Sequence, residues 1–318
     1  MRRGIKTTAL AACMAMTLAI TLAPMAQAQG VMAAMIMKRM AKRAAEQDKA
    51  SKAPPAPAAQ PLIYGSDSMQ VMDFTPPKAG ASTPAPLVVF VHGGGWTQGN
   101  KDNATGPWKA PHLSGLGYGF ANINYRLVPR VTVEDQAADV ASALAELIRQ
   151  ADRLGIDRHR IVLMGHSAGA HLVALVGTDE RYLRAAGLSF ADLAGVVPID
   201  GAAYDVPRQM EDAGRFMADR YKQAFGTDRA RQEALSPTLH AAAPNAPRFL
   251  LLHVQREDGV AQSKALADAL RKAGTPVQIN GFEGTGLKGH AEINRQLGDP
   301  DYPATPVLDA WLKAVFGR

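Results

Sequence analysis

A glycine-flanked serine turn, G-H-S-A-G at positions 165–169, constrains this chain more than any other feature of its sequence. The apolar run 161–164 precedes the turn and alanine-rich residues follow it, which is the pattern of a strand, a tight turn and a helix. The G-x-S-x-G spacing holds its central residue in strained backbone geometry and requires small neighbours on both sides. The sequence therefore predicts that Ser167 is a nucleophile and that the N–H of Ala168, at the helix start, faces developing negative charge.

Composition places the chain among ordinary globular proteins. Its 318 residues are 47% hydrophobic and 20% charged, enough for one large domain or two small ones. The formal net charge is +6, but removing Arg2, Arg3 and Lys6 from the 35 basic residues leaves 32 against 29 acidic residues. This small excess, without a basic run interleaved with aromatic residues, predicts no nucleic-acid partner.

Residues 1–28 have the pattern of a secretory signal peptide. A basic start is followed by the apolar run 7–23 and by Ala-Gln-Ala, a small-x-small cleavage pattern that ends at Ala28. We expect cleavage after Ala28 and export to the periplasm or the medium. The alternative, lipid attachment at Cys13, is disfavoured because too few apolar residues precede this cysteine. Cys13 is the only cysteine, so the exported protein would form no disulfide and would depend on its core for stability.

Residues 29–60 are expected to connect the signal peptide to the domain. Within them, 31–46 place methionines and an isoleucine at helical spacing with lysines and arginines between them, which predicts an amphipathic basic helix. Three interpretations remain open: a short helix that docks on the domain or stays mobile, a weak contact with a membrane surface, and a methionine-rich metal site. The Pro- and Ala-rich residues 49–60 predict a linker.

From residue 61 to 318 the pattern alternates between strands and helices. Such alternation predicts an α/β fold, a mostly parallel twisted sheet with helices on both faces. Strands are expected at 68–74, 87–91, 118–125, 161–164, 195–199, 249–254 and 277–282, and helices at 137–154, 261–272 and 307–316.

A longer insertion at 201–243 interrupts this alternation and is expected to form a lid. Its aromatic residues could line an apolar pocket or pack onto the core. These residues are Tyr204, Phe216, Tyr221 and Phe225.

Acyl transfer on a serine requires a base, and His290 is the best candidate among the eight histidines. It follows the last expected strand in the glycine-rich stretch 284–289, where a loop could bend toward Ser167. The other histidines have structural interpretations: a loop brace at His92, packing or pocket residues at His166 and His171, the core at His253, and surface or cap positions at His112, His159 and His240.

The acid that orients the base should follow the strand ending at Val254. Glu257 and Asp258 both satisfy this condition, and Asp258 is preferred because Gly259 after it permits a sharp loop. Asp200, at the end of the preceding strand, is an outside alternative. The resulting chain order is Ser167, Asp258, His290.

Donors for the oxyanion are expected in H-G-G-G-W at 92–96, directly after the strand at 87–91. The glycine backbone could approach a substrate carbonyl closely, so we expect the N–H groups of Gly94, Gly95 and Ala168 to form the oxyanion hole. The residues expected to contact substrate are Trp96, His166 and Tyr204.

Four motifs together resemble the α/β-hydrolase superfamily, within it the carboxylesterase group related to hormone-sensitive lipases, feruloyl-esterase-like proteins and arylformamidases. They are H-G-G-G-W at 92–96, N-Y-R-L at 124–127, G-H-S-A-G-A-H at 165–171 and G-H at 289–290. The resemblance covers the chain from about residue 64 to the C-terminus.

This resemblance implies an α/β-hydrolase fold with a small lid after the sixth core strand. It also implies Ser167 as nucleophile, His290 as base, an acid at Asp258 and the glycine loop as oxyanion hole. Arg126 would then brace the helix that carries Asp135 and Asp139. The acid region, 255–260, lacks the Asp followed three residues later by Val-Pro that is usual in the family, so the choice between Glu257 and Asp258 stays open.

The sequence thus predicts an exported serine carboxylesterase that cleaves small-molecule esters with short or aromatic acyl groups through an acyl-enzyme on Ser167. No metal or cofactor is expected, because no cluster has ligand spacing. One alternative is an arylformamidase or another amidase on the same fold. Another is a non-catalytic binding protein with a hydrolase fold, against which the complete set of catalytic side chains argues.

Overall fold

The computed structural model describes residues 53–317, apart from the side chains of Arg215 and Phe216. The predicted signal peptide at 1–28, the lipid-attachment alternative at Cys13 and the predicted basic helix at 31–46 lie outside these residues. So does the part of the predicted linker before residue 53.

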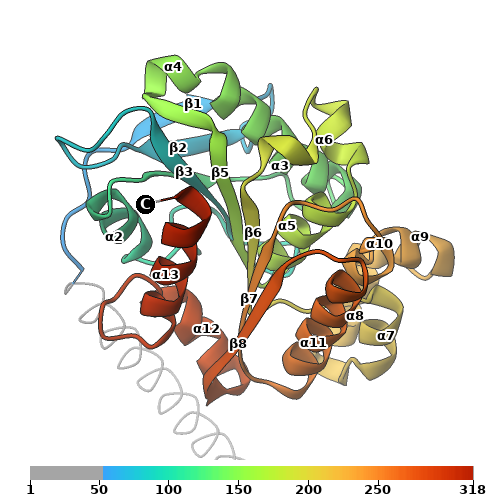
Figure 1. Ribbon diagram of the computed structural model, residues 1–318. Coiled ribbons are helices and arrows are strands. Elements are labelled where there is room, and N and C mark those ends of the chain that lie inside the picture. The colour runs from blue at the N-terminus through green and yellow to red at the C-terminus, as the bar shows by residue number, and fades with distance from the viewer. Residues whose placement is uncertain (1–52, 318) are drawn as a thin grey trace, which may run out of the picture. The chain divides into compact units, whose positions relative to one another are not determined.

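An eight-stranded sheet in the order β1-β2-β4-β3-β5-β6-β7-β8 forms the centre of the fold (Figure 1). The strands are β1 (Gln60–Ile63), β2 (Val71–Thr75), β3 (Ala85–Val91), β4 (Gly119–Ile123), β5 (Ile156–His166), β6 (Gly195–Ile199), β7 (Phe249–Gln255) and β8 (Val277–Thr285). The pairs β1–β2 and β2–β4 are antiparallel, and the pairs β4–β3, β3–β5, β5–β6, β6–β7 and β7–β8 are parallel. This confirms the predicted mostly parallel α/β fold.

Helices cover both faces of the sheet. They are α2 (Lys109–Gly115), α3 (Val133–Arg149), α4 (Ala151–Leu154), α5 (Ala168–Thr178), α6 (Arg181–Ala185), the 3-10 helix η1 (Phe190–Asp192), α11 (Glu257–Lys272), α12 (Gly286–Gln296) and α13 (Ala304–Phe316). Between β6 and β7 the chain forms α7 (Val206–Asp212), α8 (Arg215–Phe225), α9 (Arg229–Ala234) and α10 (Pro237–His240). Across residues 53–317, no helix combines the length and apolar character that a membrane span requires.

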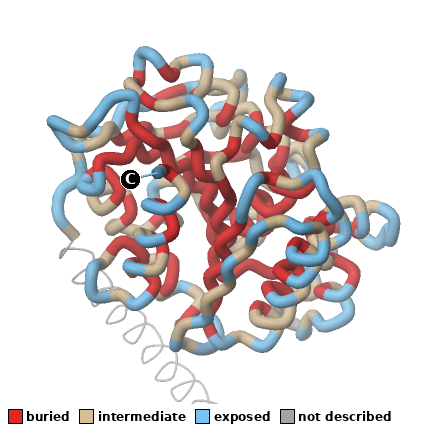
Figure 2. The backbone as a smooth tube through the Cα atoms, in the orientation of Figure 1, coloured by how far each residue is buried: buried red, intermediate tan, exposed pale blue. Residues whose placement is uncertain are grey.

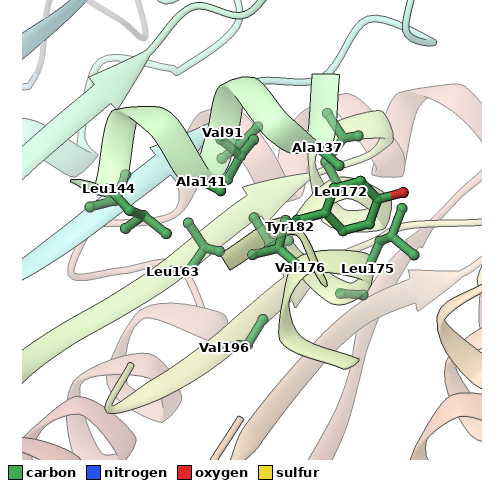
Figure 3. Packing of buried hydrophobic residues seen from close by; sticks show 14 of the residues in the cluster. Val91, Ala137, Ala141, Leu144, Leu163, Leu172, Leu175, Val176, Tyr182 and Val196 are labelled. Atoms are coloured by element: carbon green, nitrogen blue, oxygen red, sulfur yellow. The ribbon is translucent and has the colours of Figure 1, made fainter. Parts of the chain in front are cut away.

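The alternation of side chains along the central strands divides the core into two layers. Leu87, Val89 and Val91 of β3 belong to the layer with α3, α5 and α11, whereas Val88 and Phe90 belong to the layer with α2, α12 and α13. Because both faces are covered, β3 is buried along its whole length and reads as a continuous apolar run. Figure 2 shows the buried sheet between its partly exposed helices, and Figure 3 shows side chains of α3 and α5 packed on the sheet.

The structure differs from the predicted elements in three places. The single helix expected at 137–154 begins earlier, because Thr132 and Asp135 form a capping box, and it is interrupted at Gln150. Strand β1 was not expected, since it is short, exposed at the sheet edge and contains Pro61. Helix α12 replaces the loop expected around His290.

A buried ion pair joins the loop after β4 to helix α3. Asp139, whose side chain is 1% exposed, accepts hydrogen bonds from Arg126 Nη2 at 2.7 Å, Arg126 Nε at 2.9 Å and the Arg126 backbone N–H at 2.9 Å. Gln70 Nε2 adds a fourth donor at 2.8 Å. The expected bracing role of Arg126 is thus confirmed for Asp139, while Asp135 serves the helix cap.

We predict that Asp139→Asn destabilises the fold by about 2–3 kcal/mol, because it leaves the partly buried Arg126 without its counter-charge. Denaturant unfolding measures this change. Glu146→Gln is the matched control: its partner Arg149 is 69% exposed, so the loss should stay below about 1 kcal/mol. Equal losses in the two variants would contradict the prediction.

Candidate active site

The serine turn between β5 and α5 has the strained geometry that the sequence predicted. Ser167 adopts φ 56° and ψ −119°, a conformation that side-chain-bearing residues rarely occupy. A Cβ on Gly165 would lie 2.4 Å from the carbonyl oxygen of Gly169, and a Cβ on Gly169 would lie 2.1 Å from that of Val91. Glycine is therefore required sterically on both sides of the serine, as expected.

Ser167, His290 and Asp200 form a continuous hydrogen-bonded chain. His290 Nε2 lies 3.0 Å from Ser167 Oγ, and His290 Nδ1 lies 2.5 Å from Asp200 Oδ2. With Asp200 accepting at Nδ1–H, Nε2 is left unprotonated and accepts the hydrogen bond of the serine hydroxyl. This arrangement can activate the serine as a nucleophile.

His290 reaches this position from a helix and not from the loop that the sequence predicted. It lies in the first half of α12, which follows β8 without an intervening loop. The turn is close: a Cβ on Gly289 would lie 2.5 Å from the carbonyl carbon of Gly284. The glycines therefore allow two backbone segments to touch, and they do not form a flexible loop.

The prediction of Asp258 as the partner of His290 is corrected to Asp200. Helix α11 starts at Glu257, immediately after β7, so the loop that would carry a carboxylate toward His290 does not form. Asp258 lies in the first helical turn and accepts from Gln209 Nε2 at 3.4 Å, and Glu257 is exposed.

Gly259 has a different role from the predicted loop turn. A Cβ on Gly259 would lie 3.0 Å from Nη2 of Arg256, so the missing side chain makes room for this guanidinium. Arg256 Nε lies 3.1 Å from Asp200 Oδ2, and its Nη2 donates to the carbonyl oxygens of Asp200 and Gly201, both at 3.4 Å. An arginine after β7 thus pairs with a carboxylate after β6.

The environment of Asp200 keeps its carboxylate ionised. Burial, the largest single effect, acts to raise its pKa, but the hydrogen bond with His290, the charge of Arg256 and the Val254 N–H together hold the pKa below its ordinary value. The Val254 N–H donates to Oδ1 at 3.1 Å. Asp200 also has φ 43°, in the left-handed region, a feature that is concentrated at functional sites.

The glycine loop after β3 lies against the nucleophile. A Cβ on Gly93 would be 3.0 Å from the Ser167 Cβ, and one on Gly94 would be 1.8 Å from the carbonyl oxygen of Gln98. Among the described residues, no acceptor bonds to the backbone N–H groups of Gly94, Gly95 or Ala168. The oxyanion hole stays a prediction, and these N–H groups are its candidates.

Trp96 and His171 connect this loop to the nucleophile helix. Trp96 Nε1 donates to His171 Nδ1 at 3.3 Å, and His171 Nε2 donates to the Leu235 carbonyl at 2.8 Å. Because one ring nitrogen accepts and the other donates, His171 is neutral. Burial lowers its pKa to about 4, although the hydrogen bond to Leu235 acts in the opposite direction.

The three residues expected to contact substrate are buried, and their contact with substrate stays a prediction. Trp96 is 3% exposed and Tyr204 is 1% exposed, with the Tyr204 hydroxyl in the space that a Cβ on Gly201 would need. His166 donates from Nε2 to the carbonyl oxygen of His290 at 2.9 Å and packs its ring 4.4 Å from the His290 ring. The described contacts of these side chains are with other residues around the site.

Lys109, a residue that no sequence motif singles out, supports the same helix that carries His290. Its buried Nζ donates to the carbonyl oxygen of Thr105 at 2.7 Å and to both the carbonyl oxygen and Oδ1 of Asn294. Asn294 lies one turn beyond His290 on α12. Burial lowers the pKa of Lys109 to about 7. The only sequence signal was a lysine at the start of a short helix, and that signal is weak.

No group of three or more His, Cys, Asp or Glu side chains within residues 53–317 is arranged to hold a metal ion.

Comparison with known proteins places this site in context. The BD-FAE family model matches residues 72–270. Esterase LipC of Mycobacterium tuberculosis is 29% identical over 227 residues, 66% of this chain and 54% of LipC. The probable carboxylic ester hydrolase LipM of the same organism is 33% identical over 201 residues, 59% of this chain and 45% of LipM. The chain thus spans about half the length of these curated relatives.

Solved structures show the same fold. The crystal structure of Esterase B from Lactobacillus Rhamnosis (HN001) superposes with a TM-score of 0.67 at 22% identity. The match covers 90% of this chain and 94% of that one. It confirms the predicted α/β-hydrolase architecture.

The neutral state of His171 makes a prediction for acid stability. An unfolded histidine titrates near its ordinary value of 6.5, so between pH 6.5 and about 4 the unfolded chain binds a proton that the folded chain excludes. The free energy of unfolding therefore falls as the pH decreases through this window, by up to about 1.4 kcal/mol per pH unit for this residue.

We expect His171→Gln to reduce that pH slope by about this amount, because glutamine can accept and donate without titrating. Denaturant unfolding from pH 4 to pH 7 measures the slope. His159→Gln, at an exposed position, is the control and should keep the wild-type slope. An unchanged slope in His171→Gln would show that His171 does not titrate on unfolding in this range.

Proposed function

This chain belongs to the BD-FAE family, in the carboxylesterase group of the α/β-hydrolase superfamily, and from that premise we propose that it hydrolyses carboxylic esters through an acyl-enzyme on Ser167. The observation that supports this proposal is the hydrogen-bonded chain from Ser167 Oγ through His290 to Asp200. A strained serine beside free backbone donors adds to it.

In the proposed acylation step, Ser167 Oγ attacks the ester carbonyl while His290 Nε2 takes the hydroxyl proton. The buried Asp200 carboxylate stabilises the imidazolium that forms and keeps its ring oriented. The N–H groups of Gly94, Gly95 and Ala168 would stabilise the oxyanion of the tetrahedral intermediate. His290 then returns the proton to the leaving alcohol, and water repeats the sequence on the acyl-enzyme.

We propose esters with short or aromatic acyl groups as substrates. Three of the four insertion residues expected to line an apolar pocket or pack on the core, Tyr204, Tyr221 and Phe225, are buried and pack with Trp96 and the core. This packing favours a small acyl site. The side chain of the fourth, Phe216, lies outside the described part of the structure. The names of LipC and LipM, an esterase and a probable carboxylic ester hydrolase, support esters over amides. The signal pattern at 1–28 supports export as a further part of the proposal.

Hydrolysis of p-nitrophenyl esters with acyl chains from acetate to laurate tests the activity. We expect kcat/KM to fall steeply beyond short chains, because a small acyl site excludes longer ones. Ser167→Ala should reduce kcat by at least about three orders of magnitude, because it removes the nucleophile. Turnover of no ester, or full activity in Ser167→Ala, would refute the proposal.

The identity of the acid gives a separate prediction. Asp200→Asn should lower kcat by roughly three to four orders of magnitude with little change in KM, because the amide cannot stabilise the imidazolium or fix its tautomer. Asp258→Asn is the matched control, since Asp258 contacts Gln209 and not His290, and it should retain near wild-type kcat. The reverse result would assign the acid to Asp258.

A further inference from the structure

Arg220, on helix α8 of the insertion, lies across the glycine loop of the candidate active site. A Cβ on Gly95 would lie 2.4 Å from Arg220 Cδ and 3.1 Å from its Nη1. The guanidinium therefore lies beside Gly95, whose N–H is a proposed oxyanion donor. Gly93 of the same loop faces Ser167.

The aromatic residues that follow Arg220 fix this part of α8 in place. Tyr221 and Phe225 pack on the Trp96 ring, with ring centroids 5.8 and 4.7 Å away, and Phe225 also contacts His171 of the nucleophile helix at 5.3 Å. Both aromatic side chains are buried. Helix α8 is thus held against the glycine loop and against α5, so the base of the Arg220 side chain is anchored at the site.

Gly95 makes room for Arg220. Its φ of 59° alone would not demand glycine in this loop, because the next residue, Trp96, has φ 62° with a large side chain. A side chain at position 95 would instead collide with the arginine stem. The loop sequence therefore admits the guanidinium to the edge of the proposed oxyanion hole.

The charge of Arg220 has no counter-charge in the described part of the chain, unlike that of other arginines in the insertion. Arg208 pairs with Asp212 at 3.6 Å, Arg229 with Glu211 and Glu233, and Arg231 with Glu134 at 2.7 Å. Among the ion pairs within residues 53–317 none involves Arg220, and its side chain is partly exposed. The guanidinium donors are therefore free to bind an anionic group.

We propose that Arg220 is a specificity-determining residue that binds a carboxylate on the ester substrate, so that the preferred substrates carry an anionic group in addition to the scissile ester. This inference rests on the proposed esterase function and adds the substrate class. Guanidinium groups bind carboxylates with two parallel hydrogen bonds, which a lysine cannot reproduce. The carboxylate can belong to the acyl half or to the alcohol half of the ester.

Paired esters test the proposal on both halves. For the acyl half, p-nitrophenyl hydrogen glutarate is compared with neutral p-nitrophenyl valerate; for the alcohol half, m-carboxyphenyl butyrate is compared with phenyl butyrate. The readout is the ratio of kcat/KM for the anionic ester to that for its neutral partner. In Arg220→Gln we expect this ratio to fall by roughly 10- to 100-fold on one arm, as for the loss of a charge-assisted hydrogen bond.

Two further measurements separate recognition from a structural role. Arg220→Lys should give an intermediate ratio, because it keeps the charge and loses the bidentate geometry. In the wild type, rising salt should lower the ratio on the same arm, and in Arg220→Gln it should not. Arg229→Gln, an exposed arginine of the same insertion paired with Glu211 and Glu233, is the control and should keep the wild-type ratio.

A drop on either arm supports the proposal and identifies the half that carries the carboxylate. Ratios on both arms that are the same in the wild type and in Arg220→Gln would overturn it while leaving the esterase function intact. Failure of the wild type to hydrolyse any of the four esters would overturn the esterase function itself, and this inference with it.

Discussion

The buried carboxylate of Asp200 is the interaction on which the rest of the site depends. It accepts from His290 and from the Val254 N–H and pairs with Arg256, so three neighbouring elements meet at one side chain. A carboxylate with 0% exposure is stable only when such partners replace its water. Its left-handed backbone, at the end of a fully buried strand, aims the side chain toward α12. The orientation of His290 toward Ser167 follows from this contact.

Around this centre, neutral histidines and one buried lysine support the backbone of the site. His166 donates a hydrogen bond to the His290 carbonyl. His171 accepts from Trp96 and donates to the Leu235 carbonyl. Lys109 donates to Asn294 near the C-terminal end of α12. Burial keeps the pKa of His166 and His171 below the ordinary value, with the charge of His290 adding to the effect at His166. These residues therefore donate and accept in fixed directions, which gives a rigid frame around His290.

The insertion between β6 and β7 is part of this frame. Its aromatic residue Phe225 packs on Trp96 and His171. Of its arginines whose side chains are described, all except Arg220 pair with carboxylates. The same helix that packs on the proposed oxyanion loop thus brings a positive charge to Gly95. The packing of Tyr221 and Phe225 holds the segment of α8 that carries Arg220 against this loop.

The parallel sheet, the serine turn, the glycine loop and the histidine that reaches the serine could all be predicted from the sequence. These features are local: an apolar run, glycines required by close backbone contacts, and a histidine directly after the last strand. The acid was decided only by the tertiary structure. Carboxylates follow both β6 and β7, and the parallel strands bring both to the same edge of the sheet, so spacing could not separate them. Because α11 starts directly after Arg256, Asp258 is held in a helix and Asp200 reaches His290. Whether Asp200 or Asp258 reaches His290 depends on where the helix after β7 begins, and no local sequence pattern predicts that position.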